Sequence, residues 1–455
     1  MPRYFGTDGV RGPFGGPLLN VAFSRRLGRA LGENLRPAPD GEEDARPEVV
    51  VGRDTRVSGG ALVDALCSGL DAAGVQAIRL GVLPTPAIVR VGLDLEAAAM
   101  VAVTASHNPA ADNGIKVMDA GGTKVGPEWE EALEDRIDEL DTKELEGGVV
   151  SGPGDEASAE WKDHYLKASL AGRPPDLLAG RTLVVDCAHG ATAATTPEAL
   201  RRLGATVHAI GVEPDGLNIN AGCGSEHLDV LGREVLVHEA ALGLAHDGDG
   251  DRVRLVDSRG EPVPGEVVLG LLACHRLERG MLPGGHLVTT VHSNLGLDQA
   301  VRAAGGRVTR TPVGDRWVAA KLKELNGGLG GESSGHIILP AFSPTGDGLV
   351  AALDVLTVLA EGERTLADWL AAIPLFPRRE ANFRVTRKPP LAAAAAVTAC
   401  QAAWTERFGQ AGRMLLRYSG TEPVLRAVVE ARDPDQVESA FNDLAGALRQ
   451  DGLAE

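Results

Sequence analysis

The chain has 455 residues, of which 44% are hydrophobic and 24% charged, as expected for a globular protein too long for a single core. The formal net charge of −18 disfavours nucleic acid and anionic membranes as partners. The chain has no apolar run of membrane-spanning length, and its first residues lack the apolar core of a signal peptide, so we expect a cytoplasmic protein.

Similar α/β patterns recur three times along the chain. The first reads EVVVG, GGALVDALCSGLDAAG and VQAIRLG, and Leu62, Leu66 and Leu70 fall on one face of its helix. The second reads RTLVVDCAHG, TTPEALRRLGA and TVHAIG, and the third reads HLVTTV, LGLDQAVRAAGG and RVTRTP before a further helix, DRWVAAKLKELN. Because strands alternate with helices, the pattern predicts mostly parallel sheets with crossover connections.

Two segments have the composition of linkers. Residues 146–160 are rich in glycine and acidic residues, and residues 374–390 are rich in proline and basic residues. After the second segment the pattern changes to short strands and two helices, one of them the alanine tract LAAAAAVTACQAAW. The last part of the chain is therefore predicted to be a smaller α+β domain.

The five cysteines are odd in number, widely spaced and free of CxxC spacing, which argues against a disulfide framework or a zinc site. They are Cys67, Cys187, Cys223, Cys274 and Cys400.

The stretch TASHNP, at 104–109, follows the apolar run AAAMVAV and must turn at Asn-Pro. We expect it to place Ser106 on an exposed loop above a sheet, with Lys116 of DNGIKV nearby. Ser106 is not in a GxSxG elbow, and adjacent side chains diverge, so His107 is a poor partner for a Ser-His-Asp hydrolase. A turn with hydrogen-bonding polar residues is the alternative reading.

The stretch HDGDGDR, at 246–252, alternates three aspartates with glycine, so that all three carboxylates could project from one side of a loop. Such a set of oxygen ligands suits a hard divalent cation. An EF-hand is excluded, because Arg252 and Ser258 occupy the positions of its glycine and glutamate. A solvated acidic turn is the alternative, although packing three like charges costs energy unless a cation compensates.

Two further stretches have polar residues on glycine-rich turns. In GGESSGH, at 330–336, Glu332 and Ser334 could bind a polyol and His336 could act as an acid or base. In RYSGTEP, at 417–423, arginine, hydroxyls and free backbone N–H groups could hold the phosphate that so acidic a chain would otherwise repel. A capped helix and a hairpin turn are the respective alternatives.

In this order and spacing, the four stretches resemble the loops of the α-D-phosphohexomutase superfamily over nearly the whole chain. Six more stretches look like the phosphoglucosamine mutase family: YFGTDGVRG, GRDTRVSG, GVLPTPA, DCAHGA, NINAGCGS and TPVGDRWV. There are two departures. TASHNP stands where that family usually has SASHNP, and Ser333 stands where it often has glutamine.

The resemblance implies four domains around a central cleft. Three similar α/β domains with mixed sheets would occupy 1–150, 151–256 and 257–373, and an α+β domain would occupy 374–455, hinging near 374–390. The implied activity is that of an isomerase, which interconverts glucosamine 6-phosphate and glucosamine 1-phosphate for peptidoglycan precursors. It would proceed through a phosphoserine and a 1,6-bisphosphate. Phosphomannomutase/phosphoglucomutase activity on mannose or glucose phosphates is the alternative.

The resemblance also assigns roles to matching residues. Ser106 would carry the phosphoryl group and, with Asp247, Asp249 and Asp251, bind one Mg²⁺. Glu332 and Ser334 would contact the sugar. Charge stabilisation or proton transfer would fall to Lys116, His107, Arg252, His336 and Arg11. The second phosphate would be held by Arg417, Ser419, Gly420, Thr421 and Arg426.

The partners implied are a phosphosugar, a kinase that primes Ser106, and a second copy of the chain in a homodimer. Two rival functions make different demands on the same residues. A phosphatase with an aspartyl nucleophile would carry phosphate on aspartate instead of Ser106. A non-catalytic sugar-phosphate sensor would need neither Ser106 nor the full set of aspartates.

Overall fold

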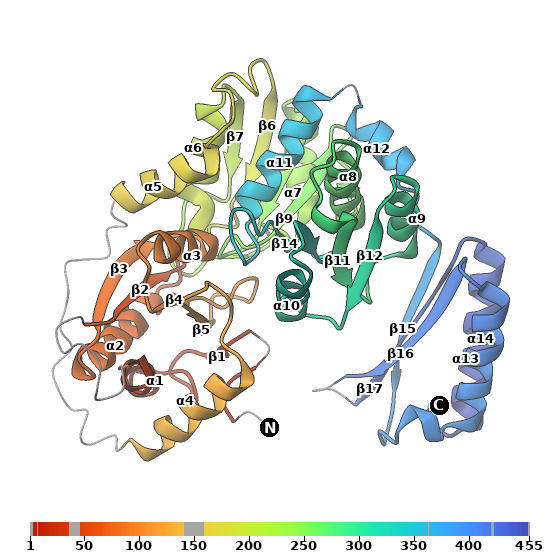
Figure 1. The fold of residues 1–455 in the computed structure, drawn as a ribbon, viewed down its shortest axis with the longest axis horizontal. Helices are drawn as coiled ribbons and strands as arrows, with labels where there is room; N and C mark the ends of the chain where they lie inside the picture. Colours follow the sequence, from red (N-terminus) through yellow and green to blue (C-terminus); the bar gives the residue numbers. More distant parts are fainter. Residues whose placement is uncertain are drawn as a thin grey trace.

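The computed structural model describes residues 3–6, 8–35, 46–140, 159–362, 364–419 and 423–453. Four sheets follow one another along the chain (Figure 1), three with helices packed on them and a fourth that stands apart with its own two helices. None of the described helices is both long and apolar enough to cross a membrane. The expected architecture of three α/β units and a C-terminal α+β unit is confirmed.

The first sheet has the strand order β1-β5-β4-β2-β3. Its elements are β1 (Val10–Pro13), α1 (Val21–Leu35), β2 (Glu48–Arg53), α2 (Gly59–Ala72), β3 (Gln76–Val82), α3 (Thr85–Asp94), β4 (Ala99–Val103), β5 (Asp112–Asp119) and α4 (Pro127–Glu139). As predicted, Leu62, Leu66 and Leu70 are buried on one face of α2. The alternation of strands and helices did not predict the two antiparallel pairs, β4 with β5 and β1 with β5.

The second sheet has the order β10-β9-β8-β6-β7 and again mixes parallel and antiparallel pairs. Its elements are α5 (Ala159–Leu170), β6 (Thr182–Asp186), the 3-10 turn η2 (Ala191–Ala194), α6 (Thr196–Arg202), β7 (Thr206–Ile210), α7 (Leu228–Val237), β8 (Leu242–His246), β9 (Val253–Asp257) and β10 (Pro262–Val263). Most of the expected linker at 146–160 lies outside the described residues.

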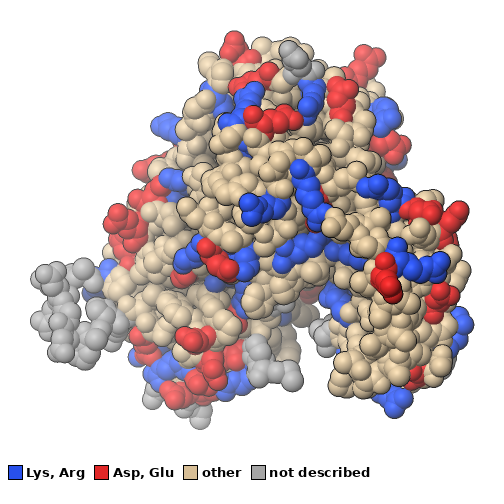
Figure 2. Space-filling view, turned by 45° about the vertical axis from the view of Figure 1, so that its right-hand side comes forward, with Lys and Arg blue, Asp and Glu red and all other residues tan. Residues whose placement is uncertain are grey.

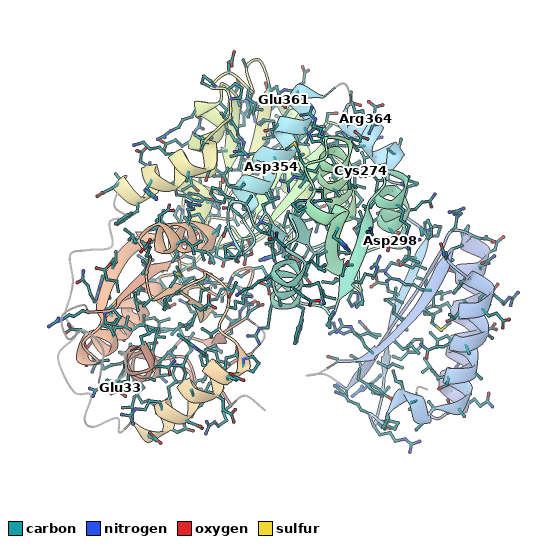
Figure 3. The ribbon with its side chains drawn as sticks, viewed as in Figure 1. Glu33, Cys274, Asp298, Asp354, Glu361 and Arg364 are labelled. Atoms are coloured by element: carbon teal, nitrogen blue, oxygen red, sulfur yellow. The ribbon has the colours of Figure 1, made fainter. Side chains whose placement is uncertain are left out.

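The third sheet has the order β12-β11-β13-β14. Its elements are α8 (Gly265–Glu278), η3 (Pro283–Gly285), β11 (His286–Thr290), α9 (Leu295–Ala303), β12 (Arg307–Thr311), α10 (Asp315–Leu325), β13 (Leu329–Gly331), β14 (Ile337–Ile338), α11 (Gly348–Glu361) and α12 (Leu366–Ala372). Asp354 on α11 accepts hydrogen bonds from Arg173, which follows α5, and from Arg276 on α8. The contact between Arg173 and Asp354, the latter labelled on α11 in Figure 3, joins the second and third units.

The fourth sheet, β15-β17-β16, is antiparallel throughout. Its elements are β15 (Arg378–Arg384), η4 (Leu391–Ala393), α13 (Ala395–Phe408), β16 (Gly412–Tyr418), β17 (Val424–Ala431) and α14 (Pro434–Gln450). The alanine tract forms α13, as predicted. The expected linker at 374–390 is partly wrong, because seven of its residues form β15 and pair along β17.

The hydrophobic core is continuous across the first three units and separate in the fourth. One cluster runs from Val50 and Ile88 of the first unit, through Leu183 of the second, to Trp369 of the third. The fourth unit packs its own cluster around Trp404. The first three units therefore form one packed body, to which the fourth is attached by a smaller contact.

Candidate active site

Ser106 lies on the loop that follows β4, a strand buried along its whole length. Its backbone is in the left-handed region, with φ of +52°, which is uncommon for a residue other than glycine. Thr104 stabilises this turn, because its hydroxyl accepts the N–H of Ser106 at 2.9 Å and donates to Asp54 at 2.7 Å. The expectation of an exposed loop is wrong, since Ser106 is 1% exposed and covered by the second unit.

Two side chains far apart in the sequence hold this loop in place. Arg56 is fully buried and donates to the carbonyls of Ser106, at 3.1 Å, and Asn108, at 2.8 Å, while Asp54 pairs with its Nε at 2.8 Å. Asn220, from the second unit, donates to the same two carbonyls at 2.9 and 3.0 Å. The position of the serine is thus fixed from both units.

The three aspartates of HDGDGDR lie between β8 and β9, and all three are buried. One carboxylate oxygen of each lies within 4.8 Å of the others. Ser106 Oγ donates to Asp247 Oδ2 at 2.6 Å, and Lys116 Nζ donates to Asp249 Oδ2 at 2.6 Å and Asp251 Oδ2 at 3.0 Å. The serine, the lysine and the aspartates therefore form one cluster.

The electrostatics of this cluster favour an additional cation. Burial, then repulsion from Asp251 and Asp249, raises the pKa of Asp247 well above its usual range. Burial opposes the charge of Lys116, but Asp249 and Asp251 still raise its pKa. Oδ1 of Asp249 and Oδ1 of Asp251 have no hydrogen-bond partner although they are buried. Two bare oxygens and an all-oxygen donor set fit a hard divalent cation, so the cluster can hold a metal ion.

His336 and Arg252 approach the cluster from its open side. His336 Nδ1 is 3.6 Å from Asp251 Oδ1, and its Nε2 is 3.5 Å from Asp315 Oδ2. Burial lowers the pKa of His336, but these two carboxylates outweigh it and raise the pKa above its usual value. Arg252 pairs with His336 through an isolated backbone bridge, and its Nε is 3.8 Å from Asp251. Arg252 places positive charge beside the aspartates, and the raised pKa of His336 favours its protonated form.

His107 and Arg11 also lie beside the serine loop. His107 Nδ1 is 3.3 Å from Ser106 Oγ, so the two side chains do not diverge as the sequence suggested. Burial and the charges of Arg252 and Arg11 lower the pKa of His107, which keeps its ring neutral. Arg11 pairs with Asp8 at 3.3 Å.

A cavity of about 350 Å³ collects these groups, and its volume lies within the range typical of small-molecule sites. All four units contribute to its wall. The lining residues are Asp8, Arg11, Ser106, Lys116, Asp251, Arg252, Val313, Gly314, Asp315, Glu332, His336 and Arg417. Figure 2 shows blue side chains gathered around the hollow between the C-terminal unit and the rest of the molecule, although the chain as a whole is acidic.

The two residues of the predicted sugar loop differ in their position relative to the cavity. Glu332 lines the cavity, and its Oε1 accepts the N–H of Gly314 at 3.0 Å. Gly335 turns the loop at φ of +94°, where a Cβ would lie 2.3 Å from the carbonyl of Val253, so glycine is required. Ser334 is not among the lining residues, although its buried Oγ has no hydrogen-bond partner.

In the predicted phosphate loop, Arg417 on β16 lines the cavity and lies opposite Arg426 on β17. Like charges directly opposite each other in a sheet are destabilising unless an anion lies between them. Burial and the charge of Arg426 lower the pKa of Arg417. Ser419 is buried beside them, whereas Gly420 and Thr421 lie outside the described residues.

His292, which the sequence did not single out, lies beside these arginines. Its carbonyl accepts from Arg378 at 2.7 Å. Burial and the charges of Arg417, Arg378, Arg413 and Arg426 lower the pKa of its ring to about 4. Arg417 lines the cavity, so the positive charge gathered around it is suited to a phosphate.

Comparison with known proteins decides the family. Sequence models for the phosphoglucomutase/phosphomannomutase α/β/α domains I, II and III match residues 2–144, 164–260 and 264–376, and the model for the C-terminal domain matches 380–447. Phosphoglucosamine mutase of Moorella thermoacetica is 44% identical over 453 residues, 99% of both chains. The chain belongs to the phosphoglucosamine mutase family. It is accordingly a phosphohexomutase, an isomerase.

Other relatives agree with this assignment. Phosphoglucosamine mutase of Mycolicibacterium smegmatis is 44% identical over 464 residues, covering 99% of this chain and 100% of the relative. The crystal structure of a phosphoglucomutase/phosphomannomutase family protein from Burkholderia thailandensis superposes with a TM-score of 0.79 at 26% identity, covering 98% and 97% of the two chains. The whole chain therefore follows the fold of this mutase family.

The sequence did not assign a role to several residues that shape the site. Arg56 lies in GRDTRVSG, Asn220 in NINAGCGS and Asp315 in TPVGDRWV, so all three lie in stretches that supported the resemblance to the mutase family. The stretches themselves were the available signal. Each of the three makes a contact with a residue more than 50 positions away, Arg56 and Asn220 with Asn108 and Asp315 with Lys124, which a local pattern cannot show.

Proposed function

We propose that the protein interconverts glucosamine 6-phosphate and glucosamine 1-phosphate through a phosphoserine at Ser106 and a bound 1,6-bisphosphate. One observation supports this most strongly: Ser106, Asp251 of its aspartate cluster and Arg417 of the C-terminal unit all line a single cavity. A mutase of this kind needs two phosphate sites of different kinds in one cavity. The cavity offers both.

The first half-reaction moves the phosphoryl group from Ser106 Oγ to O1 of glucosamine 6-phosphate. The P–Oγ bond breaks, a P–O1 bond forms, and the proton of the O1 hydroxyl ends on Ser106 Oγ, which leaves phosphorus as a hydroxyl. Lys116 and Arg252 stabilise the negative charge that spreads over the transferring oxygens. Asp247 accepts a hydrogen bond from the free Ser106 hydroxyl and holds it in place afterwards.

The second half-reaction uses the same groups after the bisphosphate has turned around. Ser106 Oγ now takes the phosphoryl group from O6, the P–O6 bond breaks, the proton of the serine hydroxyl ends on O6, and glucosamine 1-phosphate leaves. In each half-reaction Arg417, with the other arginines around His292, holds the phosphate that does not react. Burial of Ser106 protects the phosphoserine from water.

We infer that Asp247, Asp249 and Asp251, with a phosphate oxygen on Ser106, hold one Mg²⁺. The bare Oδ1 atoms of Asp249 and Asp251 support this assignment. When bound, Mg²⁺ neutralises charge on the transferring phosphoryl group. The cytoplasmic location, the priming kinase, the homodimer, the role of Ser334 and the domain boundaries remain predictions from the sequence.

The test compares kcat/KM for glucosamine 6-phosphate, glucose 6-phosphate and mannose 6-phosphate, with Mg²⁺ and a trace of the matching 1,6-bisphosphate. We expect a strong preference for the amino sugar. A preference for glucose or mannose would contradict the proposal and favour phosphomannomutase/phosphoglucomutase activity. Ser106→Ala should abolish turnover and covalent phosphate incorporation while its circular dichroism spectrum stays native, and retained turnover would exclude Ser106 as the phosphoryl carrier.

A further inference from the structure

Glucosamine phosphates differ from glucose phosphates at one position, where an ammonium replaces the hydroxyl on C2. An ammonium carries a positive charge and only donates hydrogen bonds, so a site that selects it needs a carboxylate outside the metal cluster. Three carboxylates of this kind line the cavity: Asp8, Asp315 and Glu332. If the substrate is a glucosamine phosphate, as the proposed function holds, one of these three carboxylates recognises its ammonium.

Asp8 and Glu332 are less suited to this role. Asp8 has a cation on each of its oxygens, because Lys124, which also holds Asp315, pairs with Oδ1 and Arg11 lies 3.3 Å from Oδ2. It therefore balances the cations that would serve the reacting phosphoryl group. Glu332 already accepts the N–H of Gly314 on one oxygen, and that bond fixes the sugar loop.

Asp315 is placed differently. It is the first residue of α10 and follows Gly314 directly, so it lies on the same wall as Glu332. A carboxylate at a helix N-terminus is stabilised in its ionised form. Its side chain is only 12% exposed and is held by Lys124 Nζ, 2.9 Å from Oδ1 and 2.7 Å from Oδ2, and by the N–H of Arg316, 2.9 Å from Oδ1.

These contacts leave acceptor capacity on one side of the carboxylate. An ionised carboxylate has about four lone-pair sites, and the contacts with Lys124 and Arg316 use three of them, two on Oδ1 and one on Oδ2. Oδ2 also lies 3.5 Å from Nε2 of His336, another lining residue, which places it at the cavity wall. Val313, two residues before Asp315, lines the cavity and is 37% exposed. It gives a sugar ring an apolar surface next to the carboxylate.

We propose that Asp315 is the specificity-determining residue of this site and that its Oδ2 accepts a hydrogen bond from the 2-ammonium group of the substrate. Lys124 has a positioning role, since it reaches Asp315 from the first unit and holds the carboxylate against the cavity wall. Lys124 is shared by two carboxylates, since its Nζ pairs with Asp8 as well as with Asp315, whereas only Asp315 is assigned to the ammonium. Replacing Asp315 removes the carboxylate that recognises the ammonium. Replacing Lys124 leaves that carboxylate in the cavity but holds it less firmly.

The test measures kcat/KM for glucosamine 6-phosphate and glucose 6-phosphate in the native enzyme, Asp315→Asn and Lys124→Met. In Asp315→Asn we expect the ratio of the two values to fall roughly ten- to a hundredfold, the loss expected for a hydrogen bond between charged groups. Lys124→Met, which breaks the same ion pair from the other side, should lower both values while the native enzyme's preference for the amino sugar persists. Asp315→Glu should recover part of that preference.

The outcomes separate this inference from the proposed function. If the native enzyme prefers glucose or mannose 6-phosphate, the proposed function itself is overturned. If it prefers the amino sugar and a folded Asp315→Asn keeps the native ratio, only the role of Asp315 is overturned. Should Asp315→Asn fail to fold, calorimetric binding of glucosamine 6-phosphate and glucose 6-phosphate to the native enzyme decides, because equal affinities would exclude recognition of the ammonium.

Discussion

Asp247 and Asp249 of the aspartate cluster differ in what their oxygens already bind. Asp249 receives the hydroxyl of Thr85 and the ammonium of Lys116, both at 2.6 Å, on a single oxygen, Oδ2, and its other oxygen is bare. Asp247 is occupied on both oxygens, by Ser106 and by the N–H of Arg252. Asp249 thus keeps one full oxygen free for a cation.

We therefore expect Asp249→Asn to raise the Mg²⁺ concentration needed for half-maximal activity by about tenfold or more, because an amide oxygen carries no net charge. Activity measured against free Mg²⁺, with calorimetry for Mg²⁺ binding, checks this. Asp257→Asn is the matched control, since Asp257 is buried at the end of β9 but pairs with Arg259 away from the cluster. An unchanged Mg²⁺ dependence in Asp249→Asn would remove this residue from the metal site.

Asp347 is a buried acid with consequences for stability. It caps α11 and accepts a hydrogen bond from Tyr165 of α5 at 3.0 Å. Burial raises its pKa from 3.8 to about 6, although the N–H of Val350 and Tyr165 oppose the shift. Between these two pH values the folded protein holds a proton that the unfolded chain has lost, so the free energy of unfolding falls as pH rises through this window.

A pKa shift of about two units makes the native protein lose on the order of 3 kcal/mol of stability as pH rises through this window. We expect Asp347→Asn to remove most of this loss of stability. Asparagine keeps the helix cap and can still accept from Tyr165. Urea unfolding at pH 4 and pH 7 checks the prediction. The variant should gain stability relative to the native protein as pH rises, and the same pH dependence in both proteins would contradict it.

At the scale of elements, α1 and α2 approach closely enough for their backbones to touch. A Cβ on Gly69 of α2 would lie 2.1 Å from the carbonyl of Arg25, and a Cβ on Gly28 of α1 would lie 2.1 Å from the carbonyl of Leu66. Neither carbonyl can move without disturbing its helix. The contact between these two helices therefore depends on the absence of a side chain at both glycines.

Gly69→Ala should lower the free energy of unfolding by about 1–3 kcal/mol or more through overpacking. Gly446→Ala is the control, because Gly446 lies within α14 with nothing inside 4 Å of an added Cβ. That change should be neutral or raise stability by roughly 0.5–1 kcal/mol, the usual helix preference of alanine. Thermal unfolding midpoints check both, and a Gly69→Ala variant as stable as Gly446→Ala would contradict the argument.

The same scale shows what the sequence could predict. Helical periodicity located α2 and its buried leucines, since burial follows from local spacing. It did not reveal that β4–β5 and β8–β9 are antiparallel, because alternation of strands and helices signals only crossovers. The serine loop lies in the connection between β4 and β5, and the aspartate loop lies in the connection between β8 and β9. Burial of Ser106 was also missed, because it depends on Asn220 and Gly248 of a different unit.

At the scale of the whole molecule, the first three units share one core whereas the C-terminal unit has its own. The contact between this unit and the third is largely polar. Arg378 donates to the carbonyl of His292 and Arg413 donates to the carbonyl of Ser293, both at 2.7 Å. Nearby, Asp298 pairs with Arg310 on the side of α9 that faces this unit (Figure 3). A polar, local contact is suited to rotation about it.

We predict that a hexose 1,6-bisphosphate closes the cavity by moving the C-terminal unit toward the serine loop. Arg417 is the residue of that unit on the cavity wall, so the phosphate held by Arg417 would draw the unit inward and exclude water during the turnaround of the bisphosphate. Small-angle scattering with and without glucose 1,6-bisphosphate should show a smaller radius of gyration in the complex. Arg417→Ala should lose this contraction while its unliganded profile matches the native one. Identical native profiles with and without the ligand would exclude closure, and an equal contraction in Arg417→Ala would show that closure is driven from another part of the site.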